Sequence, residues 1–318
     1  MGLSESIKFK ALELGFDLVG ITGSEQVDAE HVERFSEWIE ARFCGQMDYM
    51  RRNSDKRMDP SKLLTGAKSV ICVGLNYRPA EDPQQNEHDR DERFGKVANF
   101  ALYEDYHEFI KKRLRRLTEF ITEQIDGVWR FKICVDSVPL AERALAQRAG
   151  LGFIGKNHML INPDIGSQIM LGEIVCDLQL DPDKPFVSEC PGCEKCIRAC
   201  PAGALAADGR FDASKCISYL TIEHKDDIDA ALAEKIGNQI FGCDECVKVC
   251  PYDLPCNSAE RANKEFKFYP ARRYLDLEEL SGWQEDQFEE FFADSTIKRT
   301  GLETLKRNAK LCLKKAKS

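Results

Sequence analysis

The feature that most constrains this chain is the run Cys190-Pro-Gly-Cys193-Glu-Lys-Cys196-Ile-Arg-Ala-Cys200-Pro201. Its spacing, C-x2-C-x2-C-x3-C-P, is the pattern by which bacterial ferredoxins hold iron–sulfur clusters. The first three thiolates converge on one cluster, and the fourth, about one helical turn later, ligates the neighbouring cluster. The run therefore predicts a small domain with two clusters, whose remaining ligands come from elsewhere in the chain.

A second cysteine motif supplies those ligands. It reads Cys243-Asp-Glu-Cys246-Val-Lys-Val-Cys250-Pro251, and Ile240 stands where the full pattern would have one more cysteine. Cys216 is the natural replacement for that missing ligand. We therefore expect two 4Fe–4S clusters, the first held by Cys190, Cys193, Cys196 and Cys250 and the second by Cys200, Cys216, Cys243 and Cys246.

Cysteine usage also indicates a reducing compartment. The chain has 14 cysteines, and disulfides are rare in the cytosol, so clustered cysteines there indicate metal. Zinc is the alternative, but structural zinc takes pairs of ligands rather than this run. Cys256 lies near the motifs but off their pattern, and we expect it to be an ordinary thiol.

Composition limits the remaining function classes. There is no long apolar run for a membrane span and no signal-peptide core, so we expect a cytoplasmic chain without a membrane partner. The net charge of −9 argues against a generic nucleic-acid binder. The segment 306–317 is locally basic. A solvated helix end explains that segment best, although contact with RNA stays open.

Helices and strands alternate before the cysteine motifs, which predicts an α+β fold. Helical spacing of apolar residues predicts helices over 5–14, 31–50, 106–125 and 139–149. Runs of β-branched residues predict strands over 16–22, 68–77 and 129–135, with a polar loop over 78–95.

The chain is expected to have three parts. Residues 1–185 form a catalytic domain of layered α/β type, 186–257 a ferredoxin-like domain for two 4Fe–4S clusters, and 258–318 a helical region that packs on the core. The first part contains neither a G-x-G-x-x-G motif nor a P-loop, so it offers no nucleotide site. Because the clusters transfer only single electrons, this part must hold a catalytic cofactor or a substrate.

Several segments resemble the epoxyqueuosine reductase family, in a short form without the C-terminal helical-repeat domain of many members. The most specific is Cys216-Ile-Ser-Tyr-Leu-Thr-Ile-Glu223, which lies between the cluster motifs. The others are Val135–Arg143, Ala149–Asn157, Gly166-Ser167 with Leu171-Gly-Glu173, Gly242–Cys246 and Ser295–Gly301. The resemblance covers nearly the whole chain and implies a cobalamin-binding, nitroreductase-like first domain.

The resemblance implies a specific reaction. Such an enzyme reduces the epoxide of epoxyqueuosine at the tRNA wobble position to the alkene of queuosine. Low-valent cobalamin performs the reduction, and the two clusters feed it electrons. The implied partners are tRNA that carries epoxyqueuosine and an external donor of flavodoxin or ferredoxin type, and we expect a monomer.

Asp136 matches the proton donor proposed for the family and follows a predicted strand. A neutral carboxylic acid there requires a raised pKa, from burial or nearby negative charge. From the sequence alone, the simpler interpretation is that Asp136 caps the helix that begins near Pro139. The resemblance reverses that preference.

Other residues are candidate cobalamin contacts. They are Arg57, Asn99, Asp136, Ser137, Arg143, Gly155, Lys156, Asn157, His158, Ser167 and Ser218. The residues 155–158 could equally form a simple polar turn. His107 and His158 are not expected to bind cobalt, because the chain has no D-x-H-x-x-G motif.

Some positions depart from the family pattern. Tyr103 stands where members usually have glycine, Gln168 where they have tryptophan, and Asn99 near a usual arginine. Two other functions therefore stay open. One is a corrinoid iron–sulfur reductase of a small molecule, similar to reductive dehalogenases, and the other is a non-catalytic ferredoxin-type electron carrier.

Overall fold

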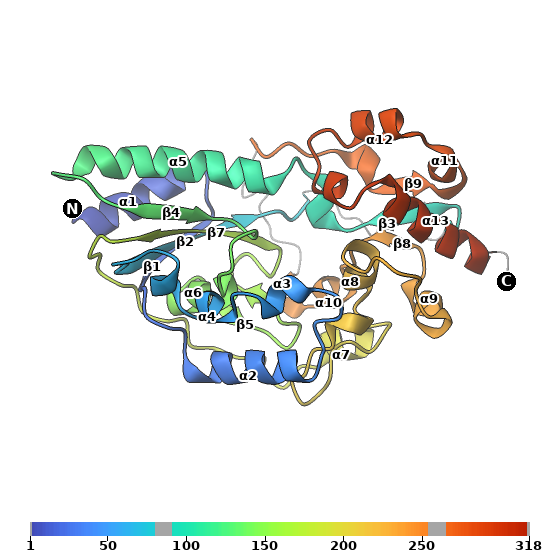
Figure 1. Ribbon diagram of the computed structural model, residues 1–318, viewed down its shortest axis with the longest axis horizontal. Helices are drawn as coiled ribbons and strands as arrows, with labels where there is room; N and C mark the ends of the chain where they lie inside the picture. The colour runs from blue at the N-terminus through green and yellow to red at the C-terminus, as the bar shows by residue number, and fades with distance from the viewer. Residues whose placement is uncertain (1, 80–90, 254–264, 317–318) are drawn as a thin grey trace.

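The structure is a computed structural model that describes residues 2–79, 91–253 and 265–316 (Figure 1). Most of the predicted loop 78–95 and Cys256 lie outside the described residues. The helices are α1 (Leu3–Glu13), α2 (Ala29–Glu40), α3 (Asp48–Arg51), α4 (Ser54–Met58), α5 (Tyr106–Gln124), α6 (Glu142–Arg148), α7 (Lys195–Ala199), α8 (Ile217–Ile222), α9 (Ala230–Ile236), α10 (Glu245–Lys248), α11 (Leu277–Gly282), α12 (Glu285–Phe291) and α13 (Leu302–Ala316). The strands are β1 (Leu18–Gly23), β2 (Ser69–Asn76), β3 (Phe94–Val97), β4 (Phe131–Cys134), β5 (Phe153–Ile154), β6 (Leu160–Ile161), β7 (Ile169–Cys176), β8 (Gln239–Phe241) and β9 (Tyr274–Asp276).

A four-stranded antiparallel sheet in the order β1-β2-β7-β4 organises the N-terminal part. The two inner strands, β2 and β7, are buried along their whole length. Burial on both faces explains their nearly continuous apolar sequences, because every side chain of an inner strand meets a packed layer. Helices cover both faces of this sheet, and this mixed arrangement confirms the predicted α+β class.

The two faces of the sheet pack against different helices. Along β2, Ile71 and Val73 face the layer of α1 and α5, whereas Val70 and Cys72 face α6. Figure 1 shows α5 running along one face and α6 lying across the other. Alternate residues of a strand point to opposite faces, so the period of two decides which helix each side chain meets. Full burial of such a side chain contributes about 1.5–3 kcal/mol.

A second sheet joins the three predicted parts of the chain. Strand β3 pairs in parallel with β8 and antiparallel with β9. These strands come from the predicted first domain, the cysteine region and the C-terminal region respectively. The predicted boundaries at 185 and 257 stay a prediction, but the segments on either side of them share one sheet and one apolar core.

The predicted helix over 31–50 is wrong in its second half. Helix α2 ends at Glu40, and the chain then turns through Arg42 and Gly45, whose φ angles are 59° and 56°. Left-handed backbone cannot continue an α-helix. A Cβ on Gly45 would lie 2.4 Å from the hydroxyl of Tyr219, so this turn is also tightly packed.

None of the described helices is long and apolar enough to cross a membrane.

Within the basic C-terminal helix α13, Arg307 has a structural role. Its guanidinium donates hydrogen bonds to the carbonyl oxygens of Leu220, His224 and Asp226, at 2.7, 2.7 and 3.0 Å. Arg307 therefore ties α13 to the end of α8, whereas Lys310 on the same helix is exposed.

Replacing Arg307 by alanine should lower the free energy of unfolding by about 1–3 kcal/mol, because the three carbonyl groups lose their donors. Denaturant unfolding measures this change, and Lys310→Ala is the matched control with little expected effect. Equal stability of the two variants would contradict the structural role of Arg307.

Candidate functional site

Four of the motif cysteines line one cavity. Cys190, Cys193, Cys196 and Cys250 surround a space of about 150 Å³ that Lys156, Asn157 and Tyr252 also border. A water molecule occupies about 30 Å³ in the liquid, so the space admits a group of several atoms. Within the described ranges, no three His, Cys, Asp or Glu side chains converge closely enough for a single metal ion. This cavity fits the first predicted cluster.

The other four motif cysteines lie close enough to influence one another electrostatically. Burial raises the pKa of Cys243 to about 12, and the thiolate of Cys216 adds to the shift. Burial also raises the pKa of Cys246, with further contributions from Cys243, Cys216 and Cys200. The structure thus gathers the residues predicted for the second cluster. Buried thiols of this kind become ligands when a bound iron replaces the proton.

The local structure repeats around both motifs. Each C-x2-C loop leads into a short helix, α7 or α10, and these two helices pack against each other. Backbone N–H groups point at cysteine sulfurs, with Ala204 N 3.3 Å from Cys200 Sγ and Lys156 N 3.4 Å from Cys190 Sγ. Such hydrogen bonds stabilise the charged thiolates of a cluster and tune its potential.

Residues 155–158 form the turn of the short β5–β6 hairpin. The simple interpretation as a polar turn is therefore correct as a description of its backbone. The turn also contacts the cysteine region, because Lys156 N–H points at Cys190 and the Asn157 side-chain amide lies 3.5 Å from the carbonyl oxygen of Cys246. The hairpin links the sheet domain to both cysteine motifs.

Asp136 lies directly after β4, as predicted, in the bend that leads to α6. Its φ angle is 55°, a left-handed conformation that is strained for a residue with a Cβ. The side chain is 59% exposed. Helix α6 begins only at Glu142, with Ala141 as its N-cap residue. The interpretation of Asp136 as a helix cap is therefore wrong, and its carboxylate is free for another role.

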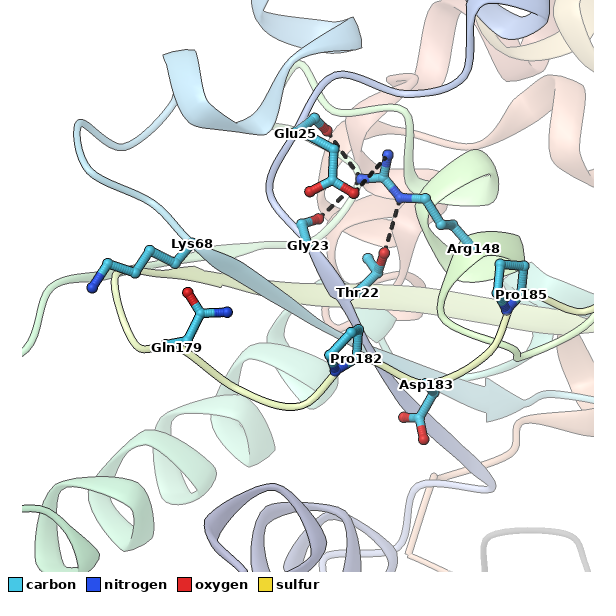
Figure 2. A pocket seen from close by; sticks show the side chains of 9 residues that line it. All are labelled: Thr22, Gly23, Glu25, Lys68, Arg148, Gln179, Pro182, Asp183 and Pro185. Carbon is cyan, nitrogen blue, oxygen red and sulfur yellow. Dashed lines mark hydrogen bonds and ion pairs between the residues drawn. The ribbon is translucent and has the colours of Figure 1, made fainter.

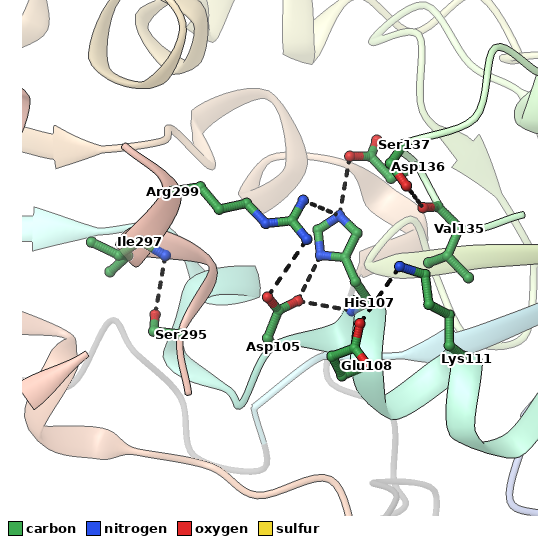
Figure 3. Close-up of polar contacts among 10 residues, drawn as sticks. All are labelled: Asp105, His107, Glu108, Lys111, Val135, Asp136, Ser137, Ser295, Ile297 and Arg299. Atoms are coloured by element: carbon green, nitrogen blue, oxygen red, sulfur yellow. Dashed lines mark hydrogen bonds and ion pairs between the residues drawn. The ribbon is translucent and has the colours of Figure 1, made fainter. Parts of the chain in front are cut away.

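A histidine joins Asp136 to a second aspartate (Figure 3). His107 Nε2 lies 3.2 Å from Asp136 Oδ2, and its Nδ1 lies 2.6 Å from Asp105 Oδ1. Asp105 caps helix α5 by accepting the His107 backbone N–H, which fixes His107 in the first turn. Arg299 Nη1 also approaches His107 Nε2, at 3.0 Å. Both imidazole nitrogens of His107 thus have partners within the protein.

The electrostatics favour a protonated histidine beside an ionised aspartate. Burial disfavours the charged imidazolium, but the hydrogen bonds to Asp105 and Asp136 outweigh it and raise the pKa of His107. The hydrogen bond from His107 lowers the pKa of Asp136. The raised pKa that a neutral acid at Asp136 would require is absent from this arrangement, because a cationic neighbour stabilises its carboxylate. The raised carboxyl pKa belongs to Glu142 instead, at about 7 through burial and the charge of Asp136.

Replacing Asp105 by asparagine should lower the pKa of His107, because the variant removes the carboxylate bonded to Nδ1. NMR titration of the His107 ring protons measures this shift. The raised pKa stabilises the fold fully below pH 6.5, and this stabilisation is lost as pH rises through the folded pKa. The variant should therefore lose more stability at acidic than at alkaline pH, and an unchanged His107 titration would contradict the arrangement.

The other predicted cofactor contacts fall into two groups. Arg57, Arg143 and His158 lie near the Asp136 bend, where Arg143 donates to the His158 carbonyl oxygen. Arg57 Nε and His158 Nε2 are buried and have no hydrogen-bond partner among the described residues. Buried polar atoms without partners are rare in folded proteins, so these two nitrogens are available to hydrogen-bond a bound polar group. The Ser137 hydroxyl donates a hydrogen bond to the Val135 carbonyl oxygen at 3.2 Å.

Asn99, Ser167 and Gln168 instead form a buried network toward the cysteine region. The Asn99 amide donates to Gln168 Oε1 at 2.9 Å, and Ser167 donates its N–H and hydroxyl to Asp253. Two departures from the family pattern, Asn99 and Gln168, therefore contact each other. The third, Tyr103, stacks on Phe266 with a centroid distance of 4.5 Å. Ser218 lies on α8, where its backbone N–H approaches the thiol of Cys216.

A separate surface hollow of about 520 Å³ lies at the other end of the sheet domain (Figure 2). Arg148, a half-buried cation that lines the hollow, donates to Thr22 Oγ1 and to the carbonyl oxygens of Gly23, Glu25 and Gln26, at 2.9–3.0 Å. The guanidinium thus links α6 to the loop after β1.

Sequence reasoning missed Asp105, Arg299, Glu142 and Glu173 as possible functional residues. A signal for Asp105 was its place two residues before a histidine at a helix start. The other three lay within the family-like segments but had no motif of their own.

Two known protein families match the two parts of the chain that form the site. A family described as "Epoxyqueuosine reductase QueG, DUF1730" matches residues 57–137, and one described as "4Fe-4S double cluster binding domain" matches residues 189–253. A protein of Leadbetterella byssophila named epoxyqueuosine reductase is 41% identical over 305 residues, which cover 96% of each chain.

Solved structures agree over nearly the whole fold. An epoxyqueuosine reductase in complex with an epoxyqueuosine-modified tRNA stem loop superposes with a TM-score of 0.89 at 30% identity, covering 98% of this chain and 81% of the other. A Bacillus subtilis epoxyqueuosine reductase, described with its catalytic aspartate loop swung out of the active site, gives the same values.

Proposed function

Since the chain belongs to the epoxyqueuosine reductase family, we propose that it reduces the epoxide of epoxyqueuosine in a tRNA anticodon to the alkene of queuosine. The observation that carries the proposal is the presence, in one fold, of a double-cluster domain and an exposed aspartate joined to a buried histidine. The first supplies electrons, and the second supplies a proton. Reduction of an epoxide to an alkene and water requires both.

The cofactors are two 4Fe–4S clusters and cobalamin. The eight motif cysteines hold the clusters, four in each of the sets that the fold gathers. A bound cobalamin supplies the low-valent cobalt chemistry that opens the epoxide. Arg57, Arg143 and His158 would hold its polar groups in a nitroreductase-like domain, because buried nitrogens of Arg57 and His158 lack protein partners. Lys156 and Asn157 lie between this region and the first cluster.

The proton reaches the substrate through Asp136. Imidazolium His107 holds a proton at Nε2, 3.2 Å from Asp136 Oδ2, and passes it to that oxygen when the opening epoxide develops negative charge. Asp136 then donates it to the substrate oxygen, which leaves as water after a second proton and two electrons have been added. The lowered pKa of Asp136 favours its ionised form between turnovers. His107 therefore carries the proton between turnovers, and the exposed Asp136 donates it to the substrate.

Arg299 supports the state that follows proton transfer. Its Nη1 lies 3.0 Å from His107 Nε2, which cannot accept a hydrogen bond while it carries a proton. Once the proton has left, the lone pair of Nε2 accepts the Arg299 N–H. Arg299 thus stabilises the neutral imidazole, and Asp105 holds the ring in place through Nδ1.

The partners follow from the reaction. The substrate is tRNA, in agreement with the stem-loop complex of the structural relative. Electrons come from a flavodoxin- or ferredoxin-type donor, and the enzyme acts as a cytoplasmic monomer.

Offering the anaerobically reconstituted holoenzyme two substrates tests the function. The epoxyqueuosine-modified stem loop should be converted, and a halogenated phenol should not. Conversion of the phenol alone would favour the small-molecule corrinoid reductase. If neither substrate were consumed by enzyme that holds both cofactors, the proposal would be refuted in favour of an electron carrier.

A further inference from the structure

A carboxylate lies in the centre of the main sheet, where no charge is expected. Glu173 stands in β7, opposite Cys72 of β2 and Cys134 of β4. Its side chain points to the α6 face, like Leu171 and Val175, and the residue is fully buried. An unpaired charge in such surroundings would be strongly unfavourable. The position therefore requires a partner or a proton.

The partner is the carboxyl group of Glu142, at the first position of α6. Neither carboxyl oxygen of Glu173 has a donor among the described residues, yet the Glu142 side chain is within hydrogen-bonding reach. Two ionised carboxylates cannot hydrogen-bond each other, because both only accept. A single proton between them removes the conflict and leaves one charge instead of two.

The same Glu142 controls the backbone of Asp136. Its Oε1 accepts the Asp136 N–H at 2.6 Å, and this bond holds the strained left-handed residue. We propose that Glu142 and Glu173 share one proton and act as a latch that holds the Asp136 bend in place for proton delivery. Both are positioning residues rather than catalytic ones, and their importance for turnover rests on the proposed function.

The surroundings set the pH range of the latch. Glu173 faces the thiols of Cys72 and Cys134. The negative charge of Asp136 raises the pKa of Glu142, and the positive charges of Arg143 and Arg57 lower it. Arg148, on the same helix, acts on Cys72. Burial raises the pKa of Glu142 to about 7 and raises that of Glu173 further. The pair therefore loses its first proton near pH 7 and keeps the shared proton until the pH exceeds the higher pKa of Glu173. Above that pKa the two carboxylates repel each other, and the bend is released.

Infrared spectroscopy tests the shared proton without any cofactor or substrate. The purified protein should show the carbonyl stretch of a protonated carboxylic acid at pH values above the ordinary range of glutamate. The band should persist at pH 7, where one proton remains on the pair, and fade at higher pH. Glu173→Gln should remove the band, whereas the exposed Glu119→Gln on α5 should keep it. A wild-type spectrum without the band at mildly acidic pH would overturn the proposal. This result would not depend on whether the chain converts epoxyqueuosine.

The kinetics of Glu142 variants test the latch. Glu142→Ala removes the acceptor for the Asp136 N–H and should lower kcat by about 10²-fold, as small misplacements of catalytic groups do, with little change in KM. Glu142→Gln keeps an acceptor oxygen, so kcat should largely recover but lose its decline above neutral pH. Wild-type kcat in Glu142→Ala, or an unchanged pH profile in Glu142→Gln, would overturn the latch.

Discussion

Replacing Asp136 by asparagine is expected to lower turnover of epoxyqueuosine-modified tRNA by about 10²- to 10⁴-fold, the contribution of a positioned proton donor. Asparagine keeps the shape of the side chain and the backbone N–H that Glu142 accepts. It cannot take a proton from His107 Nε2 and pass it on. The variant should therefore bind substrate and both cofactors but fail in the proton step. Nucleoside analysis of the tRNA under anaerobic conditions measures the loss.

Asp126→Asn is the matched control, because Asp126 is an exposed aspartate at the opposite end of β4. It should turn over like the wild type. Iron and cobalamin content must be equal in all three proteins. Wild-type turnover by Asp136→Asn with full cofactor content would remove Asp136 from the mechanism.

Replacing Cys216 by serine is expected to remove one cluster and leave the other. Cys216 lies near Cys200, Cys243 and Cys246, apart from the cavity that we predict for the first cluster. Iron content should fall from about eight to about four atoms per chain, because each cluster is of the 4Fe–4S type. Turnover should be lost with it, since the electron path is broken.

The control for this experiment is Cys176→Ala, which changes a buried thiol outside the motifs. It should keep both clusters. The electron paramagnetic resonance spectrum of reduced Cys216→Ser should show one cluster signal instead of two interacting ones. Two intact clusters in Cys216→Ser would refute the ligand assignment.

The cysteine motifs and the main elements were predictable because their signals are local. Ligand spacing along a loop identifies the cysteines that bind clusters, and the fold brings Cys250 to the cavity lined by Cys190, Cys193 and Cys196. The helix α5 and the strand β2 followed from apolar periodicity over many residues. The position of Asp136 after β4 followed from the order of strand and bend.

The proton site was not predictable because its members meet only in the folded chain. Asp105 and His107 come from the start of α5, Asp136 from the bend after β4, and Arg299 from just before α13. No spacing rule relates these segments. For the same reason the sequence did not reveal that the fold gives Asp136 a cationic neighbour and raises the pKa of the carboxyl groups of Glu142 and Glu173.

The small sheet shows the same limit. Strands β8, β3 and β9 have only three or four residues each, and they pair across more than a hundred positions of sequence. Such short strands show no clear alternation of polar and apolar residues, so the C-terminal region was expected to be helical. The finding explains why the cysteine region and the C-terminal helices share a core with the sheet domain.

The mass of the wobble nucleoside tests the central claim most directly. Native tRNA that carries epoxyqueuosine is incubated anaerobically with reduced enzyme that holds cobalamin and both clusters, then digested and analysed by mass spectrometry. The account predicts a nucleoside lighter than epoxyqueuosine by one oxygen atom, formed repeatedly by each enzyme molecule. An unchanged nucleoside, from enzyme with both cofactors verified, would contradict it.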